Sequence, residues 1–198
     1  ALIGEALVAA DKPANLKSAL TRLSVVAGEV LNNPANAPSL KQRTGKLLAT
    51  DIDSGIPRKP FHWPLAFPEV YRDGMNGFDA MVGNVPFLGS KYLKGVIGAN
   101  FREYLIANLA NGKKGRADLA VYFILRVYSA VREQGMFGLI TTNSISEGGA
   151  RQVGLEQLIK EQGAEIFSAY PNEEWQGKAS VITCRIHVKK GVWNGPIL

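Results

Sequence analysis

The sequence predicts an α/β fold in which a mainly parallel sheet of about four strands follows a helical segment at the N-terminus. From residue 78 onward, short apolar runs alternate with stretches of helical periodicity, which is typical of βα units. Before residue 34, leucines recur at helical spacing within an Ala-rich stretch. The chain has 198 residues, of which 46% are hydrophobic, and it can therefore bury one full core.

The first third of the chain divides into a helical part and an irregular part. Residues 1–33 are expected to be helical, with Pro13 beginning a second helix and Pro34 following its end. Residues 34–60 contain four prolines and two glycines, and this composition predicts a loop or linker. Residues 61–198 form the α/β part, and the two prolines within residues 61–70 exclude a regular helix there.

Four apolar runs are expected to form the sheet, over residues 78–83, 136–142, 164–169 and 179–188. Helices are expected over residues 100–109, 117–131 and 152–160, and Gly135 is expected to end the second of them. Three glycines within residues 89–98 predict a loop. This order of elements favours parallel strands, with room for one antiparallel member.

Composition narrows the class of protein. The net charge of +6 is compatible with a nucleic-acid partner, although many soluble domains without one are equally basic. The single Cys184 excludes an internal disulfide and fits a reducing compartment. No apolar stretch has spanning length and no signal-peptide pattern occurs, so we expect a cytoplasmic protein without a membrane partner. We expect no metal site, since His62 has no second ligand at metal spacing.

The most informative motif stands at the end of the first predicted strand. There the apolar run is followed by Asn84, Val85, Pro86 and Phe87. Open α/β sheets bind their ligands at the carboxyl ends of their strands. An amide, a row of main-chain carbonyls and an aromatic ring at that position suit a flat base with an exocyclic amine.

A wider set of motifs resembles the adenine-specific (N6) DNA methyltransferases, with the closest likeness to type IIG restriction–modification enzymes and related phage-defence methylases. The motifs occur in order over residues 61–70, 77–89, 101–104, 117–119, 138–145 and 177–181. The resemblance implies a partial Rossmann-like S-adenosylmethionine methyltransferase sheet. It also implies methyl transfer from S-adenosylmethionine to a flipped adenine in double-stranded DNA, for restriction–modification or phage defence.

The resemblance assigns roles to the motif at the strand end. The Asn84 side chain and the carbonyl of residue 85 would accept hydrogen bonds from the adenine amine, and Phe87 would stack on the base. The family has a second proline where this chain has Val85, so a fixed φ is lost and an N–H that needs a partner is added. Either activity is weakened, or a β-branched residue keeps the extended conformation equally well.

The chain also lacks a part of the family's pattern. No Gly-rich cofactor turn and no following acidic residue precede residue 61, so the chain resembles the second half of a catalytic domain and is expected to be inactive alone. The strand that bears Asn84 would then be a sheet edge, open to the missing N-terminal half, a second subunit or self-association. The alternative is a degenerate or truncated relative that only binds DNA or a subunit. A third class is another transferase or a nucleotide-binding enzyme.

Weaker candidates surround this motif. Asp118 could contact the cofactor or simply place a charge at a helix N-terminus. Asn143 and Ser144 could line the pocket or form a turn, and Trp175 lies where the family has a loop near the target base. Candidate DNA contacts, each of which could instead be a solvated surface residue, are Lys91, Tyr92, Lys94, Lys113, Lys114, Arg116 and Lys178.

Overall fold

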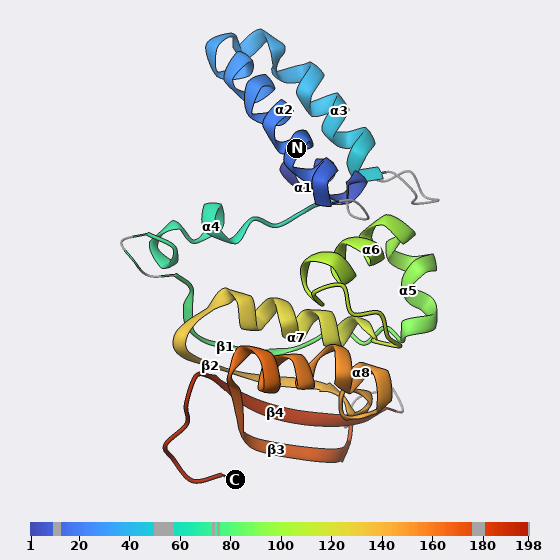
Figure 1. Ribbon diagram of the computed structural model, residues 1–198, viewed down its shortest axis with the longest axis vertical. Helices are drawn as coiled ribbons and strands as arrows, with labels where there is room; N and C mark the ends of the chain where they lie inside the picture. The colour runs from blue at the N-terminus through green and yellow to red at the C-terminus, as the bar shows by residue number, and fades with distance from the viewer. Residues whose placement is uncertain (10–12, 50–57, 73, 75, 176–180, 198) are drawn as a thin grey trace. The chain divides into compact units, whose positions relative to one another are not determined.

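A computed structural model describes residues 1–9, 13–49, 58–72, 74, 76–175 and 181–197 (Figure 1). The chain divides into two compact units. A helical unit comprises residues 1–61 and 94–112, and an α/β unit comprises residues 62–93 and 113–198. None of the helices in the described part of the chain has both the length and the apolar character needed to cross a bilayer.

The helical unit is built around a short N-terminal helix. Helix α1 (Leu2–Val8) packs against α2 (Pro13–Asn32), α3 (Ala37–Ala49) and α6 (Ala99–Asn108). Helices α1 and α2 confirm the helical prediction for the described part of residues 1–33, with a helix that begins at Pro13, while residues 10–12 lie outside the described residues.

The loop predicted over residues 34–60 is wrong where the structure forms η1 (Pro34–Asn36) and α3. Pro34 and Pro38 lie in first turns, where a missing N–H breaks no intrahelical bond. Residues 50–57 of that prediction lie outside the described residues.

Polar contacts between residues distant in the sequence hold the helical unit together. Glu5 in α1 is buried and forms an ion pair with Arg43 of α3. The Arg58 guanidinium donates to the carbonyl of Leu48 at the end of α3, at 3.1 Å, and to the carbonyl of Ile97, at 2.6 Å. Arg58 therefore satisfies carbonyls at two helix ends, which have no partner within their own helices.

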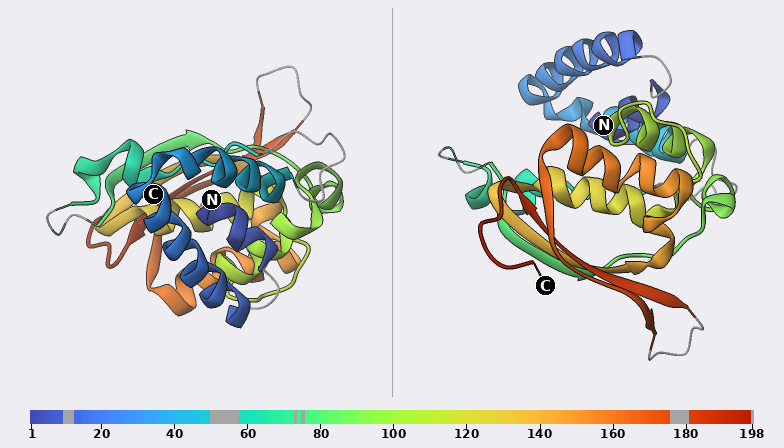
Figure 2. Two further views of the ribbon diagram at one scale, coloured as in Figure 1. Left: turned by 90° about the horizontal axis from the view of Figure 1, so that it is seen from above. Right: turned by 60° about the horizontal axis from the view of Figure 1, so that its bottom comes forward.

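The α/β unit contains a four-stranded sheet in the order β1-β2-β4-β3 (Figures 1 and 2). Its strands are β1 (Phe78–Asn84), β2 (Val131–Thr142), β3 (Ala164–Glu174) and β4 (Ile182–Lys190). Strands β1 and β2 are parallel, whereas β4 is antiparallel to both β2 and β3.

The α/β class and the four strands are confirmed, but the sheet is mixed, and the prediction of a mainly parallel sheet is wrong. Strand β4 follows β3 after too few residues for the crossover that a parallel pair requires, so the two strands form an antiparallel pair.

Helices α7 (Leu119–Ala130) and α8 (Gly148–Val153) lie on one face of the sheet (Figure 2). Alternate residues of β2 are buried, including Phe137 and Leu139. Predicted Gly135 does not end the helix, because α7 stops at Ala130 and Gly135 lies within β2. The helix predicted over residues 152–160 is divided at Gly154 into α8 and a π-helical turn, η4 (Gln157–Glu161).

Helical segments precede and follow strand β1. Short helices α4 (Trp63–Ala66) and η2 (Pro68–Val70) bring Trp63, Phe67 and Tyr71 around Phe78 at the start of β1, with ring centroids 5.4–5.9 Å apart. The loop predicted over residues 89–98 is wrong, since residues Ser90–Ile97 form α5. Leu93 of α5 is fully buried, and this packing outweighs the low helix propensity of glycine.

Candidate functional site

The carboxyl ends of three strands lie at the same end of the sheet. Strands β1 and β2 are parallel, and β3 runs in the same direction because both β2 and β3 are antiparallel to β4. This end of the sheet carries the segment Asn84–Phe87 after β1, the turn at residues 142–144 at the end of β2, and Trp175 after β3. The sequence-predicted motif therefore lies beside two further strand ends, in the position where α/β sheets bind ligands.

The segment Asn84–Phe87 is fixed at its upstream end by Val85. Asn84 and Pro86 are exposed, whereas the Val85 side chain is only 2% exposed. The Val85 N–H donates to the Ile140 carbonyl at 3.1 Å, which extends the parallel pairing one residue beyond β1. The N–H that a proline would lack thus has a partner, and the valine side chain is packed in the core.

The downstream end is fixed by helix α7. The backbone N–H of Leu119, the first residue of α7, donates to the carbonyl of Leu88 at 3.0 Å. The four residues of the segment are therefore held between strand β2 on one side and helix α7 on the other. Such anchoring at both ends limits the movement of exposed main-chain groups between them.

An aromatic pair links the segment to the end of β3. Phe87 is half-buried and meets Trp175 edge to face, with ring centroids 6.5 Å apart and planes at 87°. The backbone N–H of Trp175 donates to the carbonyl of Val181 at 3.1 Å. Among the residues that the structure describes, none hydrogen-bonds to the Asn84 side chain, so this amide is available to a ligand.

Asp118 joins helix α7 to the turn after β2. Its Oδ1 accepts from the Val121 N–H at 3.2 Å and so caps α7. Its Oδ2 accepts from the hydroxyls of Thr142, at 2.9 Å, and Ser144, at 2.6 Å. The structure confirms that Asp118 lies at a helix N-terminus, and its contact with a cofactor stays a prediction.

The turn after β2 is also held to β3. The side-chain oxygen Oδ1 of Asn143 accepts a hydrogen bond from the backbone N–H of Asn172 at 3.3 Å. The sequence suggested Asn143 and Ser144 as pocket residues but gave no sign that Ser144 and Thr142 bond to Asp118, which is distant in the chain. Two hydroxyls directly after an apolar strand were the only available signal.

The predicted DNA contacts occupy different segments. Lys91 and Tyr92 adjoin each other on α5, where the ammonium nitrogen lies 4.8 Å from the ring centre. Lys113, which forms an ion pair with Glu161, and the exposed Lys114 and Arg116 lie in the loop before α7. Lys94 belongs to the helical unit and Lys178 lies outside the described residues, so the structure does not describe the seven positions as one set.

Other groups offer less chemistry. No three His, Cys, Asp or Glu side chains gather to hold a metal ion within the described ranges. Burial raises the pKa of the Cys184 thiol, which favours its unreactive protonated form.

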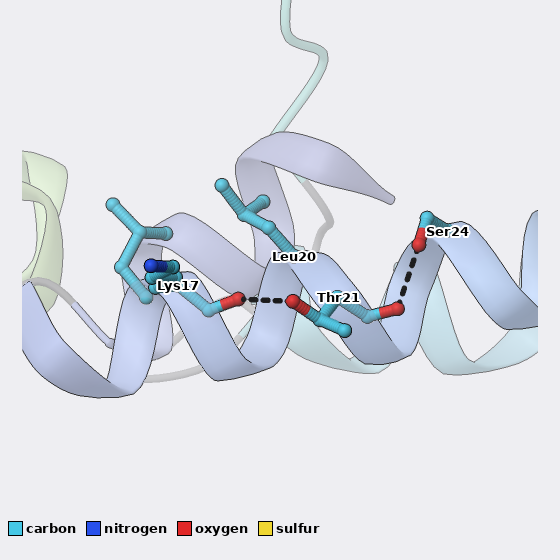
Figure 3. Close-up of a pocket in the computed structure, with 5 residues that line it drawn as sticks. Lys17, Leu20, Thr21 and Ser24 are labelled. Carbon is cyan, nitrogen blue, oxygen red and sulfur yellow. Dashed lines mark hydrogen bonds between the residues drawn. The ribbon is translucent and has the colours of Figure 1, made fainter.

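A shallow pocket along α2 is lined by Leu16, Lys17, Leu20, Thr21 and Ser24 (Figure 3). Its two hydroxyls donate to carbonyls of their own helix, so they are not directed at a ligand.

Comparisons with known proteins place the chain in a family. The sequence model described as Eco57I restriction-modification methylase matches residues 15–167. The type IIL restriction-modification enzyme MmeI, solved in complex with DNA, is 18% identical with a TM-score of 0.47, and the match covers 65% of this chain and 17% of that chain. A Listeria monocytogenes protein assigned to the class I S-adenosylmethionine-dependent methyltransferases is 12% identical with a TM-score of 0.45, and the match covers 64% and 36% of the two chains.

The chain thus spans much less than two thirds of the length of either solved protein. A search of curated proteins gave no match. The family match confirms the resemblance to restriction–modification methylases that the motifs indicated. Because it extends over most of the sequence, the chain belongs to the Eco57I restriction-modification methylase family.

Proposed function

We propose that this chain is the base-binding part of an S-adenosylmethionine-dependent DNA methyltransferase that modifies the N6 amine of adenine. One observation carries the proposal: an exposed Asn84 residue ends β1 on a segment that is anchored at both ends and that carries Phe87, whose ring meets Trp175. Membership of a restriction-modification methylase family supports double-stranded DNA as the substrate.

The chemistry of adenine explains why these groups suit it. The lone pair of the exocyclic amine is delocalised into the ring, which makes the nitrogen a weak nucleophile. Two acceptors aimed at its N–H bonds favour a tetrahedral nitrogen and release the lone pair, and Asn84 and the carbonyl of Val85 have the required character. Stacking on Phe87 would contribute roughly 1–3 kcal/mol toward holding a base outside the duplex.

S-adenosylmethionine would supply the methyl group, but the described residues do not form a complete site for it. Asp118, the acidic residue suggested for this role, gives its carboxylate oxygens to Val121, Thr142 and Ser144. The sequence contains no aromatic-x-Gly-x-Gly turn. We propose that a further part of the methyltransferase binds the cofactor and that this chain alone does not transfer a methyl group.

The outer edge of β1 is the proposed point of attachment for that part. Strand β1 lies at one side of the sheet. It pairs with β2, and no described strand pairs with its other side. Val82 of β1 is 87% exposed. An unpaired edge of this kind favours the addition of further strands, either from the cofactor-binding part or from a second subunit.

The test is transfer of a tritiated methyl group from S-adenosylmethionine to DNA by the intact protein that carries this chain. We expect Asn84→Ala to lower the rate by roughly 100-fold or more, as for loss of a preorganised donor or acceptor at a reacting centre. Asn108→Ala, a change on the surface of α6, is the matched control. Unchanged transfer by the Asn84 variant would remove the assignment.

The second candidate function is a non-catalytic module that binds DNA or a subunit. The absence of a complete cofactor site among the described residues favours it. Its signature is DNA binding by the intact protein with no incorporation of label in the same assay.

A further inference from the structure

We infer that Asp118 is a positioning residue that holds the segment Asn84–Phe87 in place by joining α7 to the end of β2. The inference rests on the proposed function, because that segment is where the base would bind. Asp118 touches neither the segment nor a ligand in this account. It acts through the two elements that anchor the segment.

The carboxylate of Asp118 is built into the protein rather than directed outward. It is 7% exposed, and its two oxygens accept three hydrogen bonds, from one backbone N–H and two hydroxyls. The hydroxyls of Thr142 and Ser144 also lie 2.8 Å from each other. A buried carboxylate with three donors is well satisfied, so the arrangement is rigid.

The two elements joined by Asp118 are the same two that anchor the segment. Helix α7 begins with Leu119, whose N–H holds the Leu88 carbonyl, and β2 provides the Ile140 carbonyl that holds the Val85 N–H. Without the Asp118 bonds to Thr142 and Ser144, the first turn of α7 and the end of β2 would lose this hydrogen-bonded connection. The two anchors would then be held together less tightly.

A helix cap alone would have a different signature, and the residues allow the two roles to be separated. Asp118→Ser keeps a capping oxygen for the Val121 N–H but cannot reach both hydroxyls. The double variant Thr142→Val with Ser144→Ala removes the hydroxyls and leaves the cap untouched. Ser129→Ala, which removes a hydroxyl bonded within α7, is the control.

Amide hydrogen exchange of the chain, followed by NMR, is the readout that needs no activity. We expect both Asp118→Ser and the double variant to increase exchange at Leu119 and Val85 by about tenfold or more, whereas Ser129→Ala leaves it unchanged. Exchange in the β3–β4 ladder should stay as in the parent. Unchanged exchange at Leu119 and Val85 in the double variant overturns the inference.

Methyl transfer by the intact protein supplies the second readout. Both variants should lower kcat by on the order of 10–100-fold, with the KM for DNA nearly unchanged, because the loss is one of alignment. A loss confined to Asp118→Ser overturns the inference and assigns the carboxylate to a ligand. If the parent protein transfers no methyl group, the proposed function fails, and the exchange measurement still decides the role of Asp118.

Discussion

Replacement of Val85 tests how much this residue, which stands where the family has the first proline of the motif, contributes to the free energy of unfolding. The side chain is 2% exposed, and Val85→Ala removes two buried carbons at about 0.8 kcal/mol each, to which a cavity term is added. We expect the α/β unit to lose roughly 2 kcal/mol of unfolding free energy. Val85→Pro keeps most of the buried carbon but removes the 3.1 Å bond to the Ile140 carbonyl.

The expected cost of Val85→Pro is smaller. Loss of the donor leaves the Ile140 carbonyl without its partner, which costs about 1–3 kcal/mol, while the proline restricts the unfolded chain and returns about 0.4–1 kcal/mol. We therefore expect a net loss of roughly 1 kcal/mol, about half of the loss in Val85→Ala.

Urea unfolding followed by tryptophan fluorescence provides the assay. All three tryptophans of the sequence, at positions 63, 175 and 193, belong to the α/β unit, so the signal reports on that unit. Val82→Ala, on the exposed part of the same strand, should change the free energy by less than about 0.5 kcal/mol. A Val85→Ala variant as stable as the Val82 control, or a Val85→Pro variant less stable than Val85→Ala, would refute the reasoning.

Three further predictions concern the same unit. Gly77→Ala should cost roughly 3 kcal/mol or more in urea unfolding, because a Cβ there, at a φ of +139°, would lie 2.4 Å from the Ala130 carbonyl oxygen. Cys184 should react with iodoacetamide at mildly alkaline pH far more slowly than free cysteine, since burial raises the pKa of its thiol; rapid labelling would contradict its burial. The hydrogen bond from Arg185 lowers the pKa of Glu173. The ionised carboxylate therefore adds stability above its ordinary pKa, and this stability is lost as the pH falls through the lowered value. Glu173→Gln should flatten the melting temperature against pH in this range, and an unchanged slope would count against the ion pair.

The strands and the strand-end motif could be predicted because their signals are local. An apolar run that ends in a polar residue marks a strand and its exposed terminus, and β1 with Asn84 follows this rule. The four strands and the N-terminal helices were located in this way. Helices α3 and α5 were missed because the prolines and glycines within and beside them favour loops, while first-turn placement and the buried Leu93 decide their structure.

Hydrophobic periodicity does not report the remaining features. The direction of β4 follows from its short connection to β3, and the anchoring of the site follows from contacts between residues distant in the sequence. The partner of the Val85 N–H is a carbonyl on β2, and the carboxylate of Asp118 meets hydroxyls more than twenty residues away. Only the folded chain brings these groups together, so the hydrogen bonds that anchor the site could not be predicted from the sequence.

The central claim is that the Asn84 segment presents adenine for methylation, and the modified nucleoside identifies the base directly. DNA treated with the intact protein and S-adenosylmethionine should be digested and its nucleosides resolved by mass spectrometry. The account predicts N6-methyladenine from the parent protein and none above background from Asn84→Ala. Methylated cytosine, unaltered N6-methyladenine in the variant, or no methylated nucleoside from the parent would contradict it.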